Sequence, residues 1–173
     1  MSRKTVKFEL AHKDFKTTQF SAFHSYEMIF GEELSPEEVL KDTYMLLSDG
    51  NWARLDENST ISALIFHPER VESPLSTLTR LMEKVKEVSC VCMYKWESVK
   101  VPKRFISSAS TVESPRGMPI LSTLFTEKLA TLHELQEFYS LDDALRMYDD
   151  FTVQNINKAL QQEKATADAK SKR

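Results

Sequence analysis

Apolar and polar residues change their spacing along this chain, and the spacing predicts where strands and helices lie. Strict alternation over Thr5–Leu10 predicts a short N-terminal strand. The segment Phe15–Phe20 continues either as a second short strand or as the start of a helix. Apolar residues then recur every three or four positions, which predicts a helix over Thr18–Phe30 that ends near Gly31.

Three further helices are predicted from their start signals. Ser35, followed by a proline and two acids, suits a helix N-terminus, and the apolar stripe continues to Leu47 before Asp49–Asn51 ends it. A short helix begins at Ser59 or Thr60 and breaks at His67, because a residue before proline disfavours the helical conformation. Ser73–Val88 carries apolar residues at helical spacing after a Ser-Pro start.

The spacing changes again over Ser89–Val101, where a period of two predicts a strand or hairpin. The two cysteines of the chain, Cys90 and Cys92, fall in this segment. A single intervening residue makes a normal disulfide or a four-ligand zinc site difficult, so we interpret both as buried or half-buried thiols of a strand or helix. A redox or metal role is the alternative.

The C-terminal part is predicted to be helical after a long loop. Residues 102–119 are rich in Ser, Pro, Lys and Arg without periodicity, which is typical of a loop or linker. Ile120–Phe138 and a second helix that starts at Ser140 both show helical spacing, which predicts a helical hairpin. Beyond Gln161 the tail has no large apolar residue, so it can extend the helix but should fray.

These elements predict an α+β fold that is mainly α: a helical domain with a small β-hairpin or sheet element and a C-terminal helical hairpin. Only three glycines occur, which disfavours an all-β fold with its many tight turns. We expect an N-terminal α+β domain over 1–101, a loop or linker over 102–119, and the helical hairpin with its frayed basic tail over 120–173.

Charge and motif content exclude several classes of function. The net charge is −3, so no global positive field attracts nucleic acid, and any such binding would be local. The glycine-rich loops that hold nucleotide phosphates are absent from the sequence. The apolar runs are far shorter than a membrane-spanning helix needs, and the start of the chain lacks a signal segment, so we expect a cytosolic protein.

Candidate catalytic and metal-binding residues are scattered. The histidines lie in separate predicted elements and in no metal-ligand spacing: His12, His24, His67 and His133. An acidic group on the last predicted helix could attract a cation or a basic partner: Asp142, Asp143, Asp149 and Asp150. Helix-start electrostatics and a solvated face explain these acids as well. We therefore expect no enzyme, no cofactor and no metal site.

The best candidates for contact with nucleic acid are the cations of the basic region 100–116, which is interleaved with aromatic and aliphatic residues. They are Lys100, Lys103, Arg104 and Arg116. Four cations without a helical register are a weak footprint for a polyanion. Nucleic acid is therefore not the partner that we expect first.

Two C-terminal segments, Tyr139–Tyr148 (YSLDDALRMY) and Val153–Leu160 (VQNINKAL), resemble the C-terminal helix of small tailed-bacteriophage morphogenesis proteins. These proteins are tail assembly chaperones and small baseplate or tail components, and the resemblance covers about the last 40 residues. It carries over no catalytic residue. It implies a non-enzymatic protein in the host cytoplasm or the virion that binds other phage structural proteins, for example by shielding a tape measure or joining a baseplate.

Such a helix would dock through apolar anchors spaced at three and four residues. The predicted partner-binding residues are Leu141, Leu145, Tyr148, Phe151, Ile156 and Leu160. The alternative is a small regulatory protein that binds nucleic acid or a host enzyme through the basic region 100–116. The sequence leaves the partner and the oligomeric state open.

Overall fold

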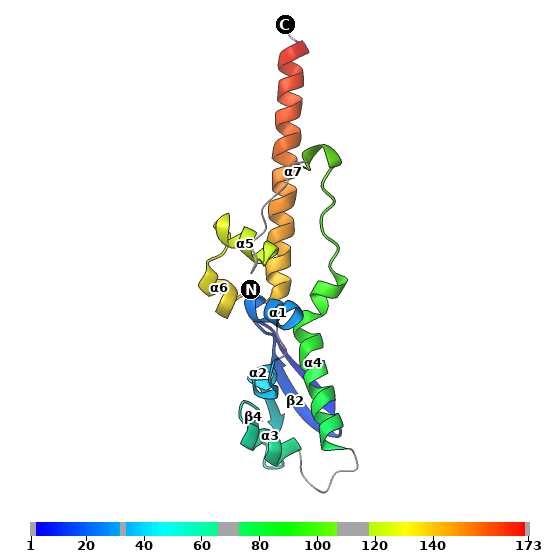
Figure 1. The fold of residues 1–173 in the computed structure, drawn as a ribbon, viewed down its shortest axis with the longest axis vertical. Coiled ribbons are helices and arrows are strands. Elements are labelled where there is room, and N and C mark those ends of the chain that lie inside the picture. The colour runs from blue at the N-terminus through cyan, green and yellow to red at the C-terminus, as the bar shows by residue number, and fades with distance from the viewer. Residues whose placement is uncertain (1–2, 32–33, 66–72, 107–117, 172–173) are drawn as a thin grey trace.

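The computed structural model describes residues 3–31, 34–65, 73–106 and 118–171. The chain is elongated, with a four-stranded sheet and its covering helices at one end and a long C-terminal helix, α7 (Leu141–Ser171), at the other (Figure 1). The fold class predicted from the sequence is confirmed: the protein is α+β and mostly helical, with one small antiparallel sheet.

The sheet has the strand order β1-β2-β3-β4, and every neighbouring pair is antiparallel. Its strands are β1 (Thr5–Leu10), β2 (Lys13–Thr18), β3 (Thr43–Leu46) and β4 (Trp52–Arg54). Ala11 and His12 form the turn between the first two strands with positive φ angles of 49° and 57°. Positive φ at both turn residues matches the twist of a tight hairpin. The segment from Phe15, which the sequence left open as a strand or a helix start, therefore belongs to a strand, β2.

The helix predicted from Ser35 to Leu47 is wrong in its second half. Its start is real, because the Ser35 side chain accepts from the Glu38 backbone N–H (3.3 Å) and the Ser35 N–H donates to the Glu38 carboxylate (2.7 Å). The helix α2 (Pro36–Leu40) has only five residues, however, and β3 follows it. Pairing of β3 with β2 buries alternate residues of the segment, and this tertiary contact overrides the apparent helical stripe.

The strand or hairpin predicted over Ser89–Val101 is also wrong. Helix α4 (Pro74–Lys95) runs for 22 residues through both cysteines, and residues 96–102 continue without helix or strand. Leu81, Val85 and Ser89 lie four apart and are all buried, so the helical period continues where the sequence suggested a period of two. Two more helices, α1 (Ala22–Phe30) and α3 (Asn58–Ile65), lie close to their predicted positions.

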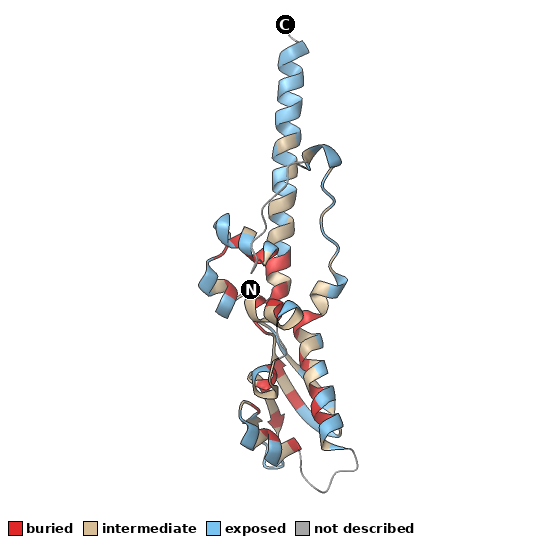
Figure 2. Cartoon of the chain, viewed as in Figure 1, coloured by how far each residue is buried: buried red, intermediate tan, exposed pale blue. Residues whose placement is uncertain are grey.

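The C-terminal third folds back so that α5 (Pro119–Thr126) packs against α7, but the helix predicted over Ile120–Phe138 is broken. A turn with Lys128 at φ 59° interrupts it, and Thr131 starts a separate helix, α6 (Leu132–Glu137), with a capping box formed with Glu134. Helix α7 extends past Gln161 to Ser171, and its last turns are exposed (Figure 2).

Three groups of buried side chains hold these elements together. The largest lies between the sheet and helices α2, α3 and α4 and includes Phe15, Leu40 and Leu81. A second joins α1 to α5, α6 and the start of α7, and a third joins α4 to α7. Figure 2 shows that burial is concentrated where these elements meet. The N-terminal sheet and the C-terminal helices are therefore linked through α1 and α4.

Two leucines of α4 provide a matched test of this core. Leu81 is fully buried, whereas Leu75 on the same helix is 65% exposed. We predict that Leu81→Ala lowers the free energy of unfolding by about 2–5 kcal/mol, through lost burial and the cavity left behind. Leu75→Ala should change it by less than about 0.5 kcal/mol. Urea unfolding of both variants measures the difference, and equal losses would contradict this core.

Candidate functional site

The histidines described by the structure lie apart. His12 lies in the β1–β2 turn with its Nδ1 atom 3.8 Å from the Glu9 carboxylate, and His133 is exposed on α6. His24 on α1 is partly buried, and this burial lowers the pKa of its imidazole. His67 lies outside the described residues. Within the described ranges, no three His, Cys, Asp or Glu side chains gather as a metal site would require.

The acids of α7 take part in contacts within the protein. The Asp143 carboxylate accepts hydrogen bonds from the Ser140 backbone N–H (3.2 Å) and hydroxyl (2.8 Å), which caps the helix. Asp142 forms an ion pair with Arg146 at 2.9 Å. Asp149 accepts a hydrogen bond from Trp96 Nε1 at 2.9 Å. Three of the four acids therefore have structural roles in capping α7, pairing with Arg146 and attaching residue 96 to the helix, whereas Asp150 is exposed.

The predicted partner-binding residues of α7 do not form one exposed stripe. Leu141 and Leu145 are 0% and 3% exposed and belong to the protein's own core, so no partner can reach them in this fold. Tyr148 is half-buried against the Trp96 ring, with 6.0 Å between the centroids. Farther along the helix, Phe151 and Ile156 are half-buried, and Leu160 is 38% exposed. Of the six predicted residues, only Leu160 is exposed, and Ile156 lines a hollow together with Val101 and Phe105.

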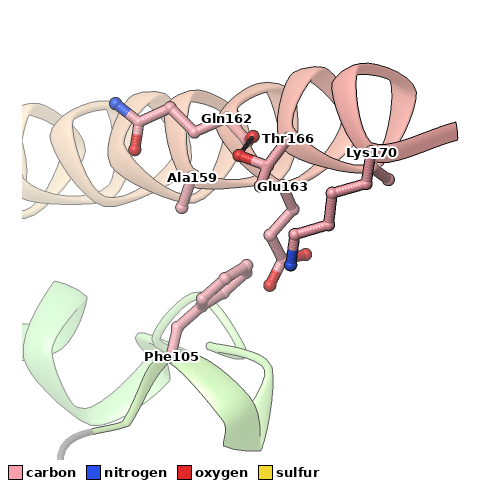
Figure 3. A pocket seen from close by; sticks show the side chains of 7 residues that line it. Phe105, Ala159, Gln162, Glu163, Thr166 and Lys170 are labelled. Atoms are coloured by element: carbon pink, nitrogen blue, oxygen red, sulfur yellow. Dashed lines mark hydrogen bonds between the residues drawn. The ribbon is translucent and has the colours of Figure 1, made fainter. Parts of the chain in front are cut away.

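The basic region lies against α7 where the structure describes it. Arg104 Nε lies 3.2 Å from both carboxylate oxygens of Glu163, and the Arg104 guanidinium lies 4.8 Å from the Phe105 ring centroid. Phe105 points toward the face of α7 that carries Ala159 and Glu163, beside a hollow of about 500 Å³ (Figure 3). The charge of Arg104 is thus neutralised within the chain.

The other candidate nucleic-acid contacts are not brought into one surface by any described contact. Lys100 and Lys103 are exposed, and Arg116 lies outside the described residues. Of the three predicted cations that the structure describes, only Arg104 has a defined ion-pair partner. Contact between this region and nucleic acid therefore stays a prediction from sequence.

A more concentrated surface lies on α5, α6 and their connection, and we name it the α5–α6 surface. It consists of four large apolar side chains that are 42–54% exposed: Phe125, Leu129, Leu132 and Phe138. Phe125 and Leu132 also line a groove of about 160 Å³ whose floor includes Leu121 and Leu135. Phe125 lies on α5, Leu129 in the connection, Leu132 at the start of α6 and Phe138 just after its end.

The rim of the α5–α6 surface is acidic. Between Met118 and Phe138 the chain carries three glutamates, Glu127, Glu134 and Glu137, and one lysine, Lys128. Hydrogen bonds from the Thr131 backbone and side chain lower the pKa of the Glu134 carboxyl, so this acid stays ionised at neutral pH. The surface thus combines an apolar centre with a negative edge.

Sequence reasoning missed this surface because it treated Ile120–Phe138 as one helix with one buried face. The capping box of Thr131 and Glu134 was the available signal for a new helix start. A break at this point turns part of the apolar stripe away from α7. Leu124 and Leu135 are therefore buried while Phe125 and Leu132 are exposed.

The two cysteines are free, with Cys90 buried and Cys92 half-buried on α4. Burial, reinforced by the neighbouring Cys92 thiol, raises the pKa of Cys90 from 9.0 to about 12. Burial also raises the pKa of Cys92. Since the thiolate is the nucleophile and the metal ligand, neither cysteine is activated for redox or metal chemistry.

No family model, curated protein or solved structure matches this chain. Within the described residues, no helix combines the length and the apolar composition needed to cross a membrane.

The buried thiols lead to a prediction about reactivity and pH. At neutral pH, the folded protein should alkylate far more slowly than the protein unfolded in urea, as mass spectrometry of both forms would show. The unfolding free energy should fall as pH rises from about 9 toward 12, since the folded state keeps a Cys90 proton that the unfolded state loses. Cys90→Ala should remove this part of the pH dependence, and an unchanged slope would contradict the assignment.

Proposed function

We propose that this chain is a non-enzymatic assembly or structural protein that binds another protein through the α5–α6 surface. The observation that carries the proposal is that Phe125 on α5 and Leu132 on α6 are exposed and line one groove, with the exposed Leu129 and Phe138 in the same stretch of chain. The C-terminal resemblance to tailed-bacteriophage morphogenesis proteins supplies the class of partner. That partner is a phage tail or baseplate protein.

The energetics favour a binding role for these side chains. Full burial of one Leu or Phe side chain stabilises by roughly 1.5–3 kcal/mol, so half-exposed groups retain part of that free energy for a partner. Aromatic side chains that fill a pocket are typical anchors of protein interfaces. Phe125 lines the groove, and Phe138 packs edge-on against Tyr139 with 5.2 Å between the ring centroids.

The shape and charge of the surface also define what it can bind. A groove between short helices accepts the apolar face of an amphipathic helix, whose anchors recur at three and four residues. The acidic rim favours lysine or arginine on the flanks of that helix. We therefore propose a basic amphipathic helix of a tail or baseplate protein as the bound segment.

Co-expression with tail and baseplate proteins of tailed bacteriophages tests this proposal. Phe125→Ser combined with Leu132→Ser removes two groove-lining anchors and should weaken capture of the tail protein by about 30-fold or more. Leu75→Ser is the matched control, because Leu75 is 65% exposed but lies on α4. This control should bind like the unchanged protein.

Two results would count against the proposal. Unchanged binding of a tail protein by the Phe125→Ser/Leu132→Ser variant, with its helix content intact by circular dichroism, would exclude the α5–α6 surface. Recovery of DNA or RNA, with an affinity that falls steeply between low and moderate salt, would favour the regulatory alternative through the basic region 100–116.

A further inference from the structure

The first strand forms a free edge of the sheet. Lys4 O accepts a hydrogen bond from Gln19 N at 2.9 Å, and bonded pairs alternate along an antiparallel ladder. By this alternation, every second residue of β1 forms backbone hydrogen bonds with β2: Val6, Phe8 and Leu10. The residues between them direct their backbone N–H and C=O groups away from β2: Thr5, Lys7 and Glu9. Among the described residues, β2 is the only strand that pairs with β1.

This edge carries one of the features that discourage strand pairing. Proteins protect sheet edges with charged side chains, especially lysine, and with proline, bulges, inward-pointing charges or very short strands. Lys7 and Glu9 are such charges, but because their signs differ they disfavour only a strand that does not offer the complementary charges. β1 has six residues in unbroken register with β2, and it contains neither proline nor glycine. The opposite edge, β4, has only three residues. The two edges of the sheet therefore differ in their capacity to accept another strand.

Charges of like sign lie opposite each other on β1 and β2, and both lysines lie over the Trp52 ring, with Lys7 Nζ 5.9 Å and Lys16 Nζ 4.5 Å from its centroid. Cross-strand partners on the solvent face are Lys7 with Lys16, and Glu9 with Asp14. Like charges directly opposite each other destabilise a strand pair. The two lysines thus form a positive row that runs across the strands, and the two acids form a negative row beside it. Each row ends at β1, the free edge of the sheet.

We propose that a second copy of this chain pairs with β1 through its own β1, antiparallel, about a two-fold axis at Phe8. In this register Lys7 lies opposite the partner's Glu9, and Glu9 lies opposite the partner's Lys7. Each like-charge row then continues into a row of opposite sign across the axis. The two sheets join into one continuous sheet, which is the self-complementary contact that two-fold symmetry requires.

Charge and polarity select this register over its neighbours. An axis at Lys7 places two lysines opposite each other, and an axis at Glu9 does the same with two glutamates. An axis at Val6 sets Lys4 opposite Phe8 on the core side of the sheet. Only the axis at Phe8 pairs unlike charges on the solvent face and apolar residues on the core face.

The core side of β1 supports the same arrangement. Val6, Phe8 and Leu10 are only half-buried in the single chain. Phe8 stacks on Phe15 with 5.7 Å between the ring centroids and 17° between the planes. At the axis, Phe8 of each copy faces the partner's Phe8 in a close, non-hydrogen-bonded pair. The aromatic row then continues across the interface and buries side chains that the monomer leaves at the margin of its core.

The register is tested by swapping charges and measuring mass by sedimentation equilibrium. Lys7→Glu and Glu9→Lys should each weaken the dimer by about tenfold or more, because each variant turns two unlike pairs into two like pairs. The double swap Lys7→Glu/Glu9→Lys should restore dimerisation. A mixture of the two single variants should form the mixed dimer, in which every pair is again of unlike charge.

The matched control is Lys13→Glu, which makes the same charge change at an exposed position of β2 away from the free edge. It should dimerise like the unchanged protein. The proposal is overturned if the unchanged chain stays monomeric at high micromolar concentration, or if dimerisation ignores the swaps at positions 7 and 9. If Phe125→Ser/Leu132→Ser abolishes the dimer instead, self-association belongs to the α5–α6 surface and not to β1. The β1 proposal can therefore fail while the proposed function stands, and the reverse also holds.

Discussion

The contact between the start of α1 and the start of α7 is the constraint on which the rest of the structure depends. The Ala22 N–H donates to Tyr139 O at 2.7 Å, and Ser21 pairs with Ser140 as an isolated antiparallel bridge. Ala22 is fully buried here, so a larger side chain at this position would push the two helix starts apart. This junction fixes the C-terminal helices against the element that follows the sheet, and it thereby sets which faces of α5 and α6 remain exposed.

Local signals predicted the parts of the fold that depend on local chemistry. The alternation of β1, the Ser35 cap and the proline start of α4 all correspond to real elements. The errors occur where distant residues decide the structure. Thr43–Leu46 became a strand because β2 was available to pair with it, and Ser89–Lys95 stayed helical because α1 and α7 pack on α4. Neither contact can be read from a short window of sequence.

The candidate site was harder to predict than the fold. An apolar stripe shows that a helix packs against something, but it does not show whether that partner belongs to the same chain. Leu141 and Leu145 were predicted to bind a partner and instead belong to the protein's own core. Phe125 and Leu132 belonged to the stripe predicted over Ile120–Phe138, yet both are exposed. Leu132 follows the turn at Lys128, which starts a new helix, whereas Phe125 lies on α5 before that turn, beside the buried Leu124.

The two proposed contacts use different parts of one elongated molecule. The β1 edge belongs to the sheet at one end, whereas the α5–α6 surface belongs to the helices packed on the start of α7 (Figure 1). Neither contact therefore blocks the other, and a two-fold dimer through β1 would carry two α5–α6 surfaces. Two linked sites can bind a repeated or dimeric partner far more tightly than one site, provided that their spacing matches. In an assembly protein, self-association would in this way convert modest apolar contacts into stable capture.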